Sequence, residues 1–335
     1  MGIKDINKNL QKLCPEAFKS IPLESLRGKA IGIDASLWLF RSKSSAMKDA
    51  LRMIEDPLEA LDSGLITENL IKQMYGFVYK LMMAGITPVW IFDGPSHPAK
   101  LAVQKRKTCR EKIKTFIDEE RSRIGSLDIL SRKKEYPEFV RLLLTNIFFT
   151  KNEEQSLYDE IHSLGLPIFR APHDGEIFAS VLSRRGLLYG VWTTDTDTYA
   201  VGAYATLSNF SKGYSSEGTK VDAVIPSVII EKLGITHSQF VDFCILHECD
   251  FNLRIPKLGP VGILKKMETY NWDLDLFKEK EPSLPWEMVN IELCREIFKG
   301  PDTSEISAAD LKIDRKKWTE KIKTLAFTMP LPDIS

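Results

Sequence analysis

The stretch from Ala171 to Gly202 reads APHDGEIFASVLSRRGLLYGVWTTDTDTYAVG, and both the fold and the chemistry that we expect depend on it. It contains four carboxylates in two close pairs: Asp174 with Glu176, and Asp195 with Asp197. Residues 177–185 have the apolar spacing of a helix. Residues 188–192 form a short apolar strand candidate that leads directly into the second pair.

Alternate residues of a strand point to the same side, so Asp195 and Asp197 would aim both carboxylates at one spot if the chain stays extended there. Two carboxylates that close repel each other unless a proton or a cation neutralises them. Oxygen-only ligands suit a hard cation such as Mg²⁺. The alternative is that the acids are solvated loop residues or helix caps. Two pairs, each beside an apolar strand candidate, favour the metal site.

Two earlier strand candidates also end on an acid. The apolar run from Ala30 to Ile33 leads into Asp34, and the segment PVWIFDG places Asp93 directly after its apolar residues. In an open α/β sheet, ligands bind in the crevice at the carboxyl ends of the parallel strands. Because strands and helices alternate over residues 29–210, we expect an α/β fold with a mostly parallel, doubly wound sheet flanked by helices.

The sequence marks the expected helices with different strength. An amphipathic helix begins at Thr67 and ends at Gly85, with apolar residues at helical spacing. Residues 43–66 are polar and irregular, and we expect a loop-rich insertion there. Further helices are expected at 226–233 and 238–247.

The composition limits the class of protein. The chain has 335 residues, of which 43% are hydrophobic and 27% charged, as in a globular protein with ample material for a core. No run approaches the roughly 18 apolar residues of a spanning helix, so we expect no membrane partner. Five cysteines without a CxxC motif indicate a reducing, intracellular setting and no zinc site.

The formal net charge is zero, with 46 basic and 46 acidic residues, which argues against a nucleic-acid partner unless the charge is segregated. Between residues 100 and 134 it is segregated, because twelve Lys and Arg stand there against five acids. Lys107, Arg110 and Lys114 share one helical face in this run. A solvated charged helix is the usual reason for such a run, and a face that binds the phosphate backbone is the alternative.

Six motifs occur in order along the chain: MGIK, IGIDAS, PVWIFDG, LGLPIFRAPHDGE, TTDTDTYAVG, and QFVDFCILHECDF followed by LGP. Together they resemble the flap endonuclease branch of the structure-specific 5′-nuclease superfamily, over roughly residues 1–267. Any one of these motifs is weak, whereas all of them in this order are highly specific. The resemblance implies an inserted helical arch and a C-terminal helical DNA-binding region, a helix-two-turn-helix.

The resemblance implies that seven acids bind metal: Asp34, Asp93, Asp174, Glu176, Asp195, Asp197 and Asp250. Seven carboxylates are too many for one ion and suit two Mg²⁺ ions, for which Mn²⁺ can substitute. We assign the first four acids mainly to one ion and the last three to the other. The segment RIPKLGPVG resembles the helix-two-turn-helix, so we also expect a K⁺ ion there.

Basic and aromatic positions carry over in the same way. Lys100 and Lys107 match residues that reach the scissile phosphate, and Arg106 replaces Lys107 if the register shifts by one. The expected substrate contacts are Gly2, Phe40, Arg110, Lys114 and Gly259. Phe40 matches a tyrosine that stacks on a base of the substrate, and the alternative for it is a core aromatic in a helix.

The chain departs from the family pattern at several positions. The family motif E-A-E is D-G-E here, so Asp174 has a shorter arm, and either Gly175 lets the backbone move in or a water bridges to the metal. Lys257 replaces a usual glycine, and Val261 and Gly262 stand where basic residues are common, which predicts a weaker grip on duplex DNA. The segment TMPLPDIS lacks the sliding-clamp motif of the family.

Two polar residues beside the acids receive no metal role. His173 has no partner at ligand spacing. Glu248 precedes Asp250 by two positions, and we expect a surface acid at a helix end, with an outer-sphere carboxylate as the alternative.

The function that the resemblance implies is hydrolysis of DNA phosphodiesters at 5′ flaps or branched junctions, by a two-metal-ion mechanism, in replication or repair. One alternative is a 5′–3′ exonuclease or RNA-primer remover on the same site. The other is a catalytically silent DNA-binding member of the fold, against which the seven acids weigh. We expect a monomer that binds DNA with a 5′ single-stranded flap, in the nucleus or another place of DNA replication.

We expect two regions. Residues 1–250 form the nuclease core, with the basic helical arch at about 100–150, and residues 251–335 form the helix-two-turn-helix and a C-terminal helical region.

Overall fold

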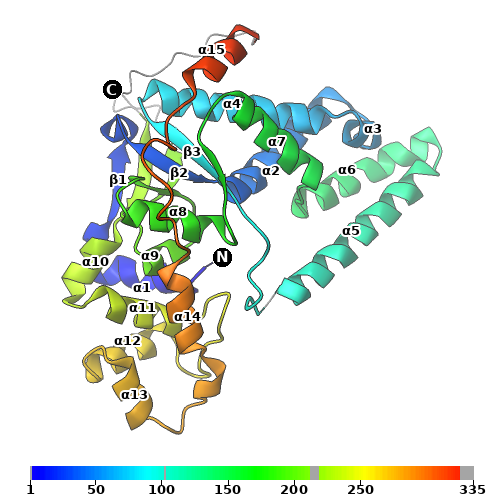
Figure 1. Cartoon of the computed structure of the whole chain (residues 1–335). Helices are drawn as coiled ribbons and strands as arrows, with labels where there is room; N and C mark the ends of the chain where they lie inside the picture. The colour runs from blue at the N-terminus through cyan, green and yellow to red at the C-terminus, as the bar shows by residue number, and fades with distance from the viewer. Residues whose placement is uncertain (1, 102, 212–218, 325–335) are drawn as a thin grey trace.

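The computed structural model describes residues 2–101, 103–211 and 219–324, which form a seven-stranded sheet with helices packed against it (Figure 1). The strands are β1 (Phe18–Pro22), β2 (Ala30–Asp34), β3 (Thr87–Phe92), β4 (Ile168–Arg170), β5 (Gly190–Trp192), β6 (Thr206–Ser211) and β7 (Lys220–Val224). Their order in the sheet is β1-β7-β6-β5-β2-β3-β4.

Five neighbouring strands, from β6 to β4, pair in parallel, whereas β7 pairs antiparallel with both β6 and β1. The expectation of a mostly parallel sheet flanked by helices is therefore confirmed. The sequence did not indicate β1. Its burial alternates little, and it ends on Pro22, as an edge strand can.

The helices of the described residues are α1 (Ile6–Leu13), α2 (Ala35–Met53), α3 (Pro57–Asp62), α4 (Leu65–Met83), α5 (Val103–Gly125), α6 (Ile129–Thr145), α7 (Lys151–Ser163), α8 (Gly175–Arg184), α9 (Asp197–Val201), α10 (Pro226–Leu233), α11 (His237–Leu246), α12 (Pro260–Thr269), α13 (Leu274–Lys280), α14 (Ile291–Lys299) and α15 (Arg315–Thr324). Short 3₁₀ turns cover Pro15–Ala17, Leu23–Leu26 and Trp286–Met288.

Side chains of β3 alternate between two hydrophobic clusters. Trp90 and Phe92 pack in the larger cluster with residues of α2, α4 and α7. Val89 and Ile91 pack in another cluster with residues of α8. Because successive strand residues point to opposite faces, this alternation means that helices cover both faces of the sheet.

Helix α2 continues through residues 43–53, where the sequence predicted a loop-rich insertion, so that prediction is wrong there. Its buried residues Ala46, Met47 and Ala50 recur at helical spacing. Lys43 in the same helix forms a buried ion pair with Glu153 of α7, with 2.7 Å between Nζ and Oε2. The polar residues of this segment made it resemble a loop. Its lysine is buried because it pairs with an acid more than one hundred positions away in the sequence.

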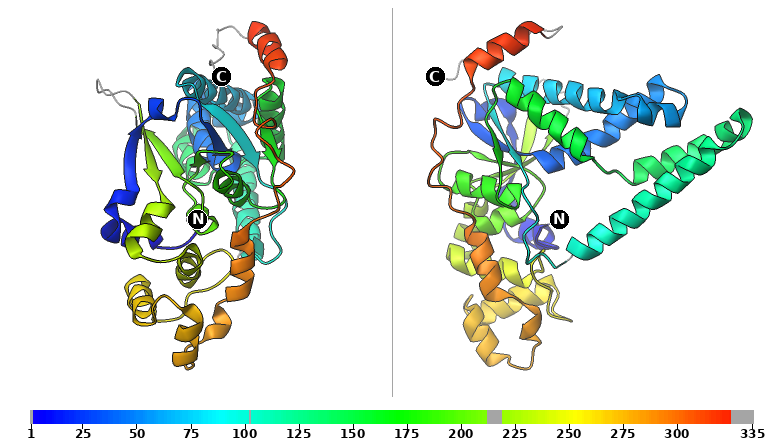
Figure 2. Two further views of the ribbon diagram at one scale, coloured as in Figure 1. Left: turned by 60° about the vertical axis from the view of Figure 1, so that its left-hand side comes forward. Right: turned by 45° about the vertical axis from the view of Figure 1, so that its right-hand side comes forward.

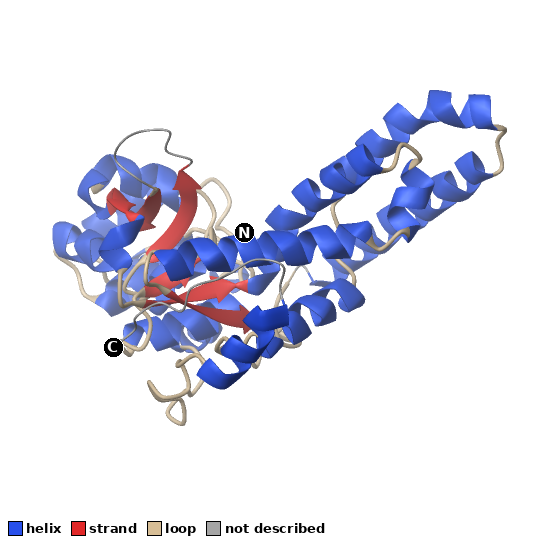
Figure 3. Cartoon of the chain, turned by 90° about the horizontal axis from the view of Figure 1, so that it is seen from above, coloured by secondary structure: helices blue, strands red, loops and turns tan. Residues whose placement is uncertain are grey.

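Helices α5 and α6 form a hairpin that projects from the sheet, as the right-hand view of Figure 2 and the view from above in Figure 3 show. This is the expected helical arch. Near its tip it rests on α3, because the Tyr136 hydroxyl donates to Oδ2 of Asp56 over 2.7 Å and Arg121 pairs with Asp62. Ile124 of the hairpin is buried in the larger hydrophobic cluster.

The helices that follow the sheet form a second core together with α1. It includes Ile6 and Leu10 of α1, Phe243 of α11 and Phe277 of α13. After α14 the chain returns along the molecule to α15, whose Trp318 is buried (Figure 1). No helix in the described part of the chain combines the length and hydropathy that crossing a membrane requires.

Candidate active site

Two of the acids end neighbouring parallel strands. Asp34 is the last residue of β2, and Asp93 directly follows β3, which pairs with β2 in parallel. Asp34 is buried. Its Oδ1 caps α2 by accepting from the Leu37 backbone over 2.9 Å, and its Oδ2 accepts from the Thr193 hydroxyl over 2.8 Å. The carboxyl end of the sheet therefore holds these two acids in fixed positions.

Three acids come closest together. Glu176 in the first turn of α8, Asp195 in the loop after β5 and Asp197 at the start of α9 each offer a carboxylate oxygen within 4.8 Å of the others. The proposed cause of this convergence was wrong, because β5 ends at Trp192 and Asp197 is helical rather than extended. A turn closes the gap, since the Asp197 backbone N–H donates to Oδ1 of Asp195 over 3.2 Å.

These three acids have what a divalent cation requires of its ligands. Asp197 is only 3% exposed, and its Oδ1 is buried without a hydrogen-bond partner among the described residues. An unpaired buried carboxylate oxygen is costly unless it binds a cation or a proton. The donor set consists of oxygen atoms alone, which is typical of Mg²⁺ and similar hard cations.

Burial and mutual repulsion raise the pKa values of the buried acids. Burial, with repulsion from Asp93, raises the pKa of Asp34 to about 7. The pKa of Glu176 lies well above its ordinary value because of burial and of repulsion from Asp195, and the pKa of Asp197 does so for the same reasons. A cluster with these pKa values is poised to accept positive charge.

Lys100 contacts two further acids of the site, Asp174 and Asp250. Its ammonium forms an ion pair with Oδ1 of Asp174 and lies 3.7 Å from Oδ2 of Asp250. Burial lowers the pKa of Lys100, but the attraction of Asp174 and of the neighbouring acids outweighs this effect, so the pKa is raised overall. Lys100 therefore remains positively charged beside the acids.

A cavity of about 580 Å³ opens at this place. Its lining includes Asp34, Asp93, Asp174, Glu176, Asp195 and Asp250, together with Ser36, Leu37, Phe40, Lys100, Arg110, Phe149, Thr193 and Thr194. Phe40 is 49% exposed, so the alternative of a core aromatic is wrong. The structure thus brings six of the seven predicted acids to one cavity. The seventh, Asp197, is buried and converges with Glu176 and Asp195.

The other predicted basic residues lie on α5. Arg110 lines the cavity, whereas Lys107 and Lys114 are exposed and are not part of its lining. The side chain of Arg106 lies outside the described part of the structure, as does the segment from Thr328 on which the sliding-clamp prediction rests.

The two glycines named from the sequence differ in their surroundings. Gly2 has a φ of 79°, and a Cβ on it would lie 2.0 Å from Oδ1 of Asp195, so no side chain fits there. Gly259 caps the start of α12 without a side-chain hydrogen bond. It does not line the acidic cavity.

Sequence reasoning missed two hydroxyl residues that orient the acids. Ser36 donates to Oδ2 of Asp93 over 2.5 Å, and Thr193 donates to Asp34. Their positions, two after Asp34 and two before Asp195, were the available signal. His173 has the role of a structural residue, since its Nδ1 lies 2.8 Å from the Pro95 carbonyl oxygen.

A larger cavity, of about 820 Å³, lies at the amino ends of β2 and β5. No carboxylate lines it, and its polar groups include Arg184 and His237. It therefore lacks the ligands for a hard cation, and we place the chemistry in the smaller, acidic cavity.

The parallel sheet and the convergent carboxylates define a class: an α/β protein with a carboxylate cluster, able to hold a divalent cation, at the carboxyl edge of its strands. A family model described as the XPG N-terminal domain matches residues 1–113, and one described as the XPG I-region matches residues 165–250. Together these matches cover more than half of the chain. The chain belongs to the flap endonuclease branch of the structure-specific 5′-nuclease superfamily.

Among curated relatives, flap endonuclease 1 of Cryptosporidium muris is 30% identical over 333 residues, which are 95% of this chain and 66% of that protein. The chain covers 62% of the Cryptosporidium parvum enzyme. The chain thus spans slightly less than two thirds of the length of these two relatives.

Solved structures share the fold. Flap endonuclease-1 from Methanococcus jannaschii has a TM-score of 0.60 at 20% identity, covering 96% of this chain and 92% of that one. The catalytic core of Rad2 in complex with a DNA substrate has a TM-score of 0.55 at 18% identity, with 98% and 87% covered.

Proposed function

We propose that this chain is a metal-dependent, structure-specific 5′ nuclease that hydrolyses DNA phosphodiesters at 5′ flaps or related branched junctions, in replication or repair. The observation that carries the proposal is the convergence of Glu176, Asp195 and Asp197 beside a cavity lined by four further acids. Membership in the flap endonuclease branch supports it, and the buried, unpaired oxygen of Asp197 weighs against a silent DNA-binding protein.

The proposed cofactors are two Mg²⁺ ions, for which Mn²⁺ can substitute. Asp34, Asp93, Asp174 and Glu176 would serve mainly one ion, and Asp195, Asp197 and Asp250 the other. Divalent ions bound there would supply the activated water and the positive charge that phosphodiester hydrolysis needs. The hydroxyls of Ser36 and Thr193 keep Asp93 and Asp34 turned toward the cavity.

Lys100 has the proposed role of a fixed positive charge. It lies in the cavity wall, paired with Asp174, and it stays protonated because the acids around it raise its pKa. A preformed charge stabilises negative charge that develops in the transition state without reorganising at that moment. Lys107, and Arg106 in its place, remain predicted partners of the scissile phosphate.

The substrate would enter between the sheet and the arch. Phe40 and Phe149 present aromatic surface to the cavity, and a base that stacks on an aromatic ring gains about 1–3 kcal/mol. Arg110 lies on the same wall, and Lys114 follows one turn later on α5. These positions suit a single strand whose phosphates meet the basic helix and whose bases stack.

The C-terminal region is proposed to bind the duplex. Gly259 is the N-cap of α12, whose first backbone N–H groups need an acceptor, and such helix ends bind phosphates. A K⁺ ion at this turn is part of the proposal. The division into a nuclease core, residues 1–250, and a C-terminal region, residues 251–335, is also part of the proposal, although side chains from both parts share the second hydrophobic core. We expect a monomer at sites of DNA replication.

A labelled 5′-flap duplex tests the proposal, with single-stranded and nicked duplex substrates beside it. We expect Mg²⁺-dependent cleavage near the junction that EDTA abolishes, and no cleavage by Asp195→Ala at wild-type DNA affinity. Preferred cleavage of the nicked duplex from its 5′ end would instead identify the exonuclease. Cleavage in EDTA, or by Asp195→Ala, would contradict the metal mechanism.

A further inference from the structure

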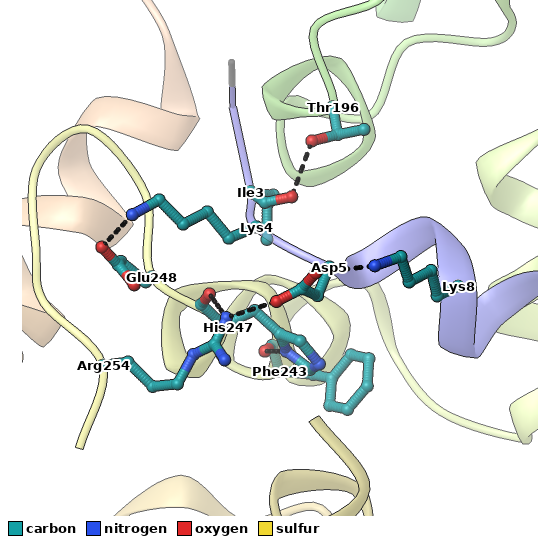
Figure 4. A network of polar contacts seen from close by, with 9 residues as sticks. All are labelled: Ile3, Lys4, Asp5, Lys8, Thr196, Phe243, His247, Glu248 and Arg254. Carbon is teal, nitrogen blue, oxygen red and sulfur yellow. Dashed lines mark hydrogen bonds and ion pairs between the residues drawn. The ribbon is translucent and has the colours of Figure 1, made fainter. Parts of the chain in front are cut away.

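The first residues of the described chain form a wall of the acid cluster. Gly2 lies so close to Asp195 that a side chain would collide with its carboxylate. The Thr196 hydroxyl, between the two acids of the D-x-D segment, donates to the Ile3 carbonyl over 3.1 Å. Figure 4 shows this contact and the polar network that continues from it.

The next two residues of the chain are tied to the loop that carries Asp250. The Lys4 backbone N–H donates to the Glu248 carbonyl over 3.0 Å, and the two side chains form an ion pair. Asp5 pairs with Arg254, with 3.1 Å between Oδ2 and Nη2. Because Glu248 and Arg254 lie on either side of Asp250, both ends of its loop are held by the same short segment (Figure 4).

Arg254 closes the loop on itself as well. Its Nη2 donates to the His247 carbonyl over 3.2 Å, so one guanidinium joins Asp5 to the end of α11. The loop from His247 to Arg254 therefore cannot shift away from the first residues unless two ion pairs break.

The backbone of this network is held in an unfavourable conformation. Glu248 has a φ of 70° and Asp5 a φ of 58°, in the left-handed region that residues with a side chain rarely adopt. A glycine would fit either position with less strain. The charged side chains at these positions thus oppose local preference and in return make the ion pairs.

We propose that the Lys4–Glu248 and Asp5–Arg254 ion pairs form a clamp that positions Asp250 relative to Asp195, so that divalent-metal affinity depends on residues that contact neither metal nor substrate. The inference rests on the proposed metal site. Without such a clamp, repulsion between Asp250 and the acids at 195 and 197 would push the loop outward. Lys4, Glu248, Asp5 and Arg254 are thus positioning residues.

Exposed ion pairs add little to global stability, which makes the clamp testable. The Lys4 side chain is 61% exposed, so Lys4→Ala should unfold at the wild-type temperature. Titration of the metal-free protein with Mn²⁺ by calorimetry should nevertheless show binding weakened by about 10-fold, the lower end of the effect of losing an outer-shell partner. Asp250→Asn identifies which part of the isotherm depends on this loop.

Two further variants separate positioning from folding. Glu248→Gly removes the ion pair but relieves the left-handed strain, so it should be at least as stable as wild type and still bind Mn²⁺ more weakly. The Lys4→Ala/Glu248→Gln double variant should bind no more weakly than Lys4→Ala or Glu248→Gln alone, because all three proteins lose the same ion pair. Lys232→Ala, which breaks an exposed ion pair with Glu16 away from the acids, is the matched control and should bind Mn²⁺ as wild type does.

Wild-type Mn²⁺ binding by both Lys4→Ala and Glu248→Gly overturns the clamp, and so does a loss of affinity that merely follows a loss of stability. The proposed nuclease fails separately: a wild-type protein that binds Mn²⁺ through Asp250 but leaves the flap duplex intact would contradict the enzyme while the binding isotherms still support the clamp.

Discussion

The backbone N–H of Gly175 donates to Oδ1 of Asp93 over 2.7 Å, and a Cβ at position 175 would lie 3.0 Å from that oxygen. The start of α8 is therefore drawn close to the acid that follows β3. This approach favours the first of the two explanations for the D-G-E motif, in which the backbone moves in and offsets the short arm of Asp174.

Gly175→Ala should raise the Mg²⁺ concentration needed for half-maximal cleavage, because the new methyl group pushes α8 away from Asp93. Asp174→Glu alone should leave that concentration unchanged, since the backbone already compensates. The double variant, with the longer arm and the displaced backbone, should recover most of the loss. Rate measurements against Mg²⁺ concentration decide this, and an improvement by Asp174→Glu alone would favour the bridging water.

Asp195→Asn should make the metal-free protein more stable. Burial raises the pKa of Asp195, and Asp195 in turn raises the pKa of Glu176 and of Asp197 by repulsion, so removal of its charge relieves strain among all three. We expect the free energy of unfolding, measured with urea at pH 8 in EDTA, to rise by about 1 kcal/mol, which is the energy equivalent of a shift of one pKa unit. Added Mg²⁺ should stabilise wild type more than the variant, and a metal-free variant less stable than wild type would argue against repulsion.

Lys100→Ala should slow the chemical step by about 100-fold in single-turnover experiments, the scale seen when one preorganised donor is removed from a transition state. DNA affinity should change much less, since the lysine acts on charge that develops during the reaction. Lys112→Ala, an exposed lysine on α5 outside the cavity lining, is the control. Equal rates for the two variants would remove Lys100 from the mechanism.

Lys257→Gly should raise the free energy of unfolding by about 1 kcal/mol, because Lys257 has a φ of 65° and glycine adopts this left-handed conformation without a steric penalty. Lys257→Ala keeps the Cβ and the strain, so it serves as the control and should not show the gain. Denaturant unfolding of the three proteins measures the difference. A glycine variant no more stable than the alanine variant would mean that neighbouring contacts favour this conformation.

His247 should make stability depend on pH. It is fully buried, and burial lowers its pKa to about 4, against an ordinary value of 6.5. His247 in the unfolded chain therefore binds a proton more readily than His247 in the folded protein. The folded protein consequently loses stability as the pH falls from about 7 toward 4. Between pH 7 and 5, wild type should lose about 2 kcal/mol more than His247→Gln, whose amide can donate to the Phe243 carbonyl as the ring now does. Parallel curves would contradict the shifted pKa.

The sequence predicted the parallel core of the sheet because short apolar strands that end on acids are a local pattern. It also identified the acids of the cavity, although by a partly wrong route. The D-x-D segment was expected to be extended, whereas Asp197 begins a helix. Its carboxylate converges with that of Asp195 because a turn follows the strand, and a turn of this kind has no period by which to recognise it.

Other features depend on contacts between distant residues. The second half of α2 looked like a loop because Lys43 is polar, and its partner Glu153 becomes its neighbour only in the folded chain. The same holds for the link from Lys4 to Glu248, which spans 244 positions. Helix and strand periods report on neighbours along the chain, so such pairs were beyond the reach of the sequence.

The length of helix α2 sets the distance between the acid cluster and the arch. The helix is anchored at one end by Asp34, which belongs to the acid cluster, and at the other it leads to α3, on which the arch rests through Asp56 and Asp62. Its 19 residues span about 28 Å at the usual rise per residue. This helix therefore holds the acids and the arch tip at a fixed distance from each other. Insertion or deletion of a helical turn in α2 would therefore change the distance between the acids and the arch without replacing any residue that we propose to contact DNA.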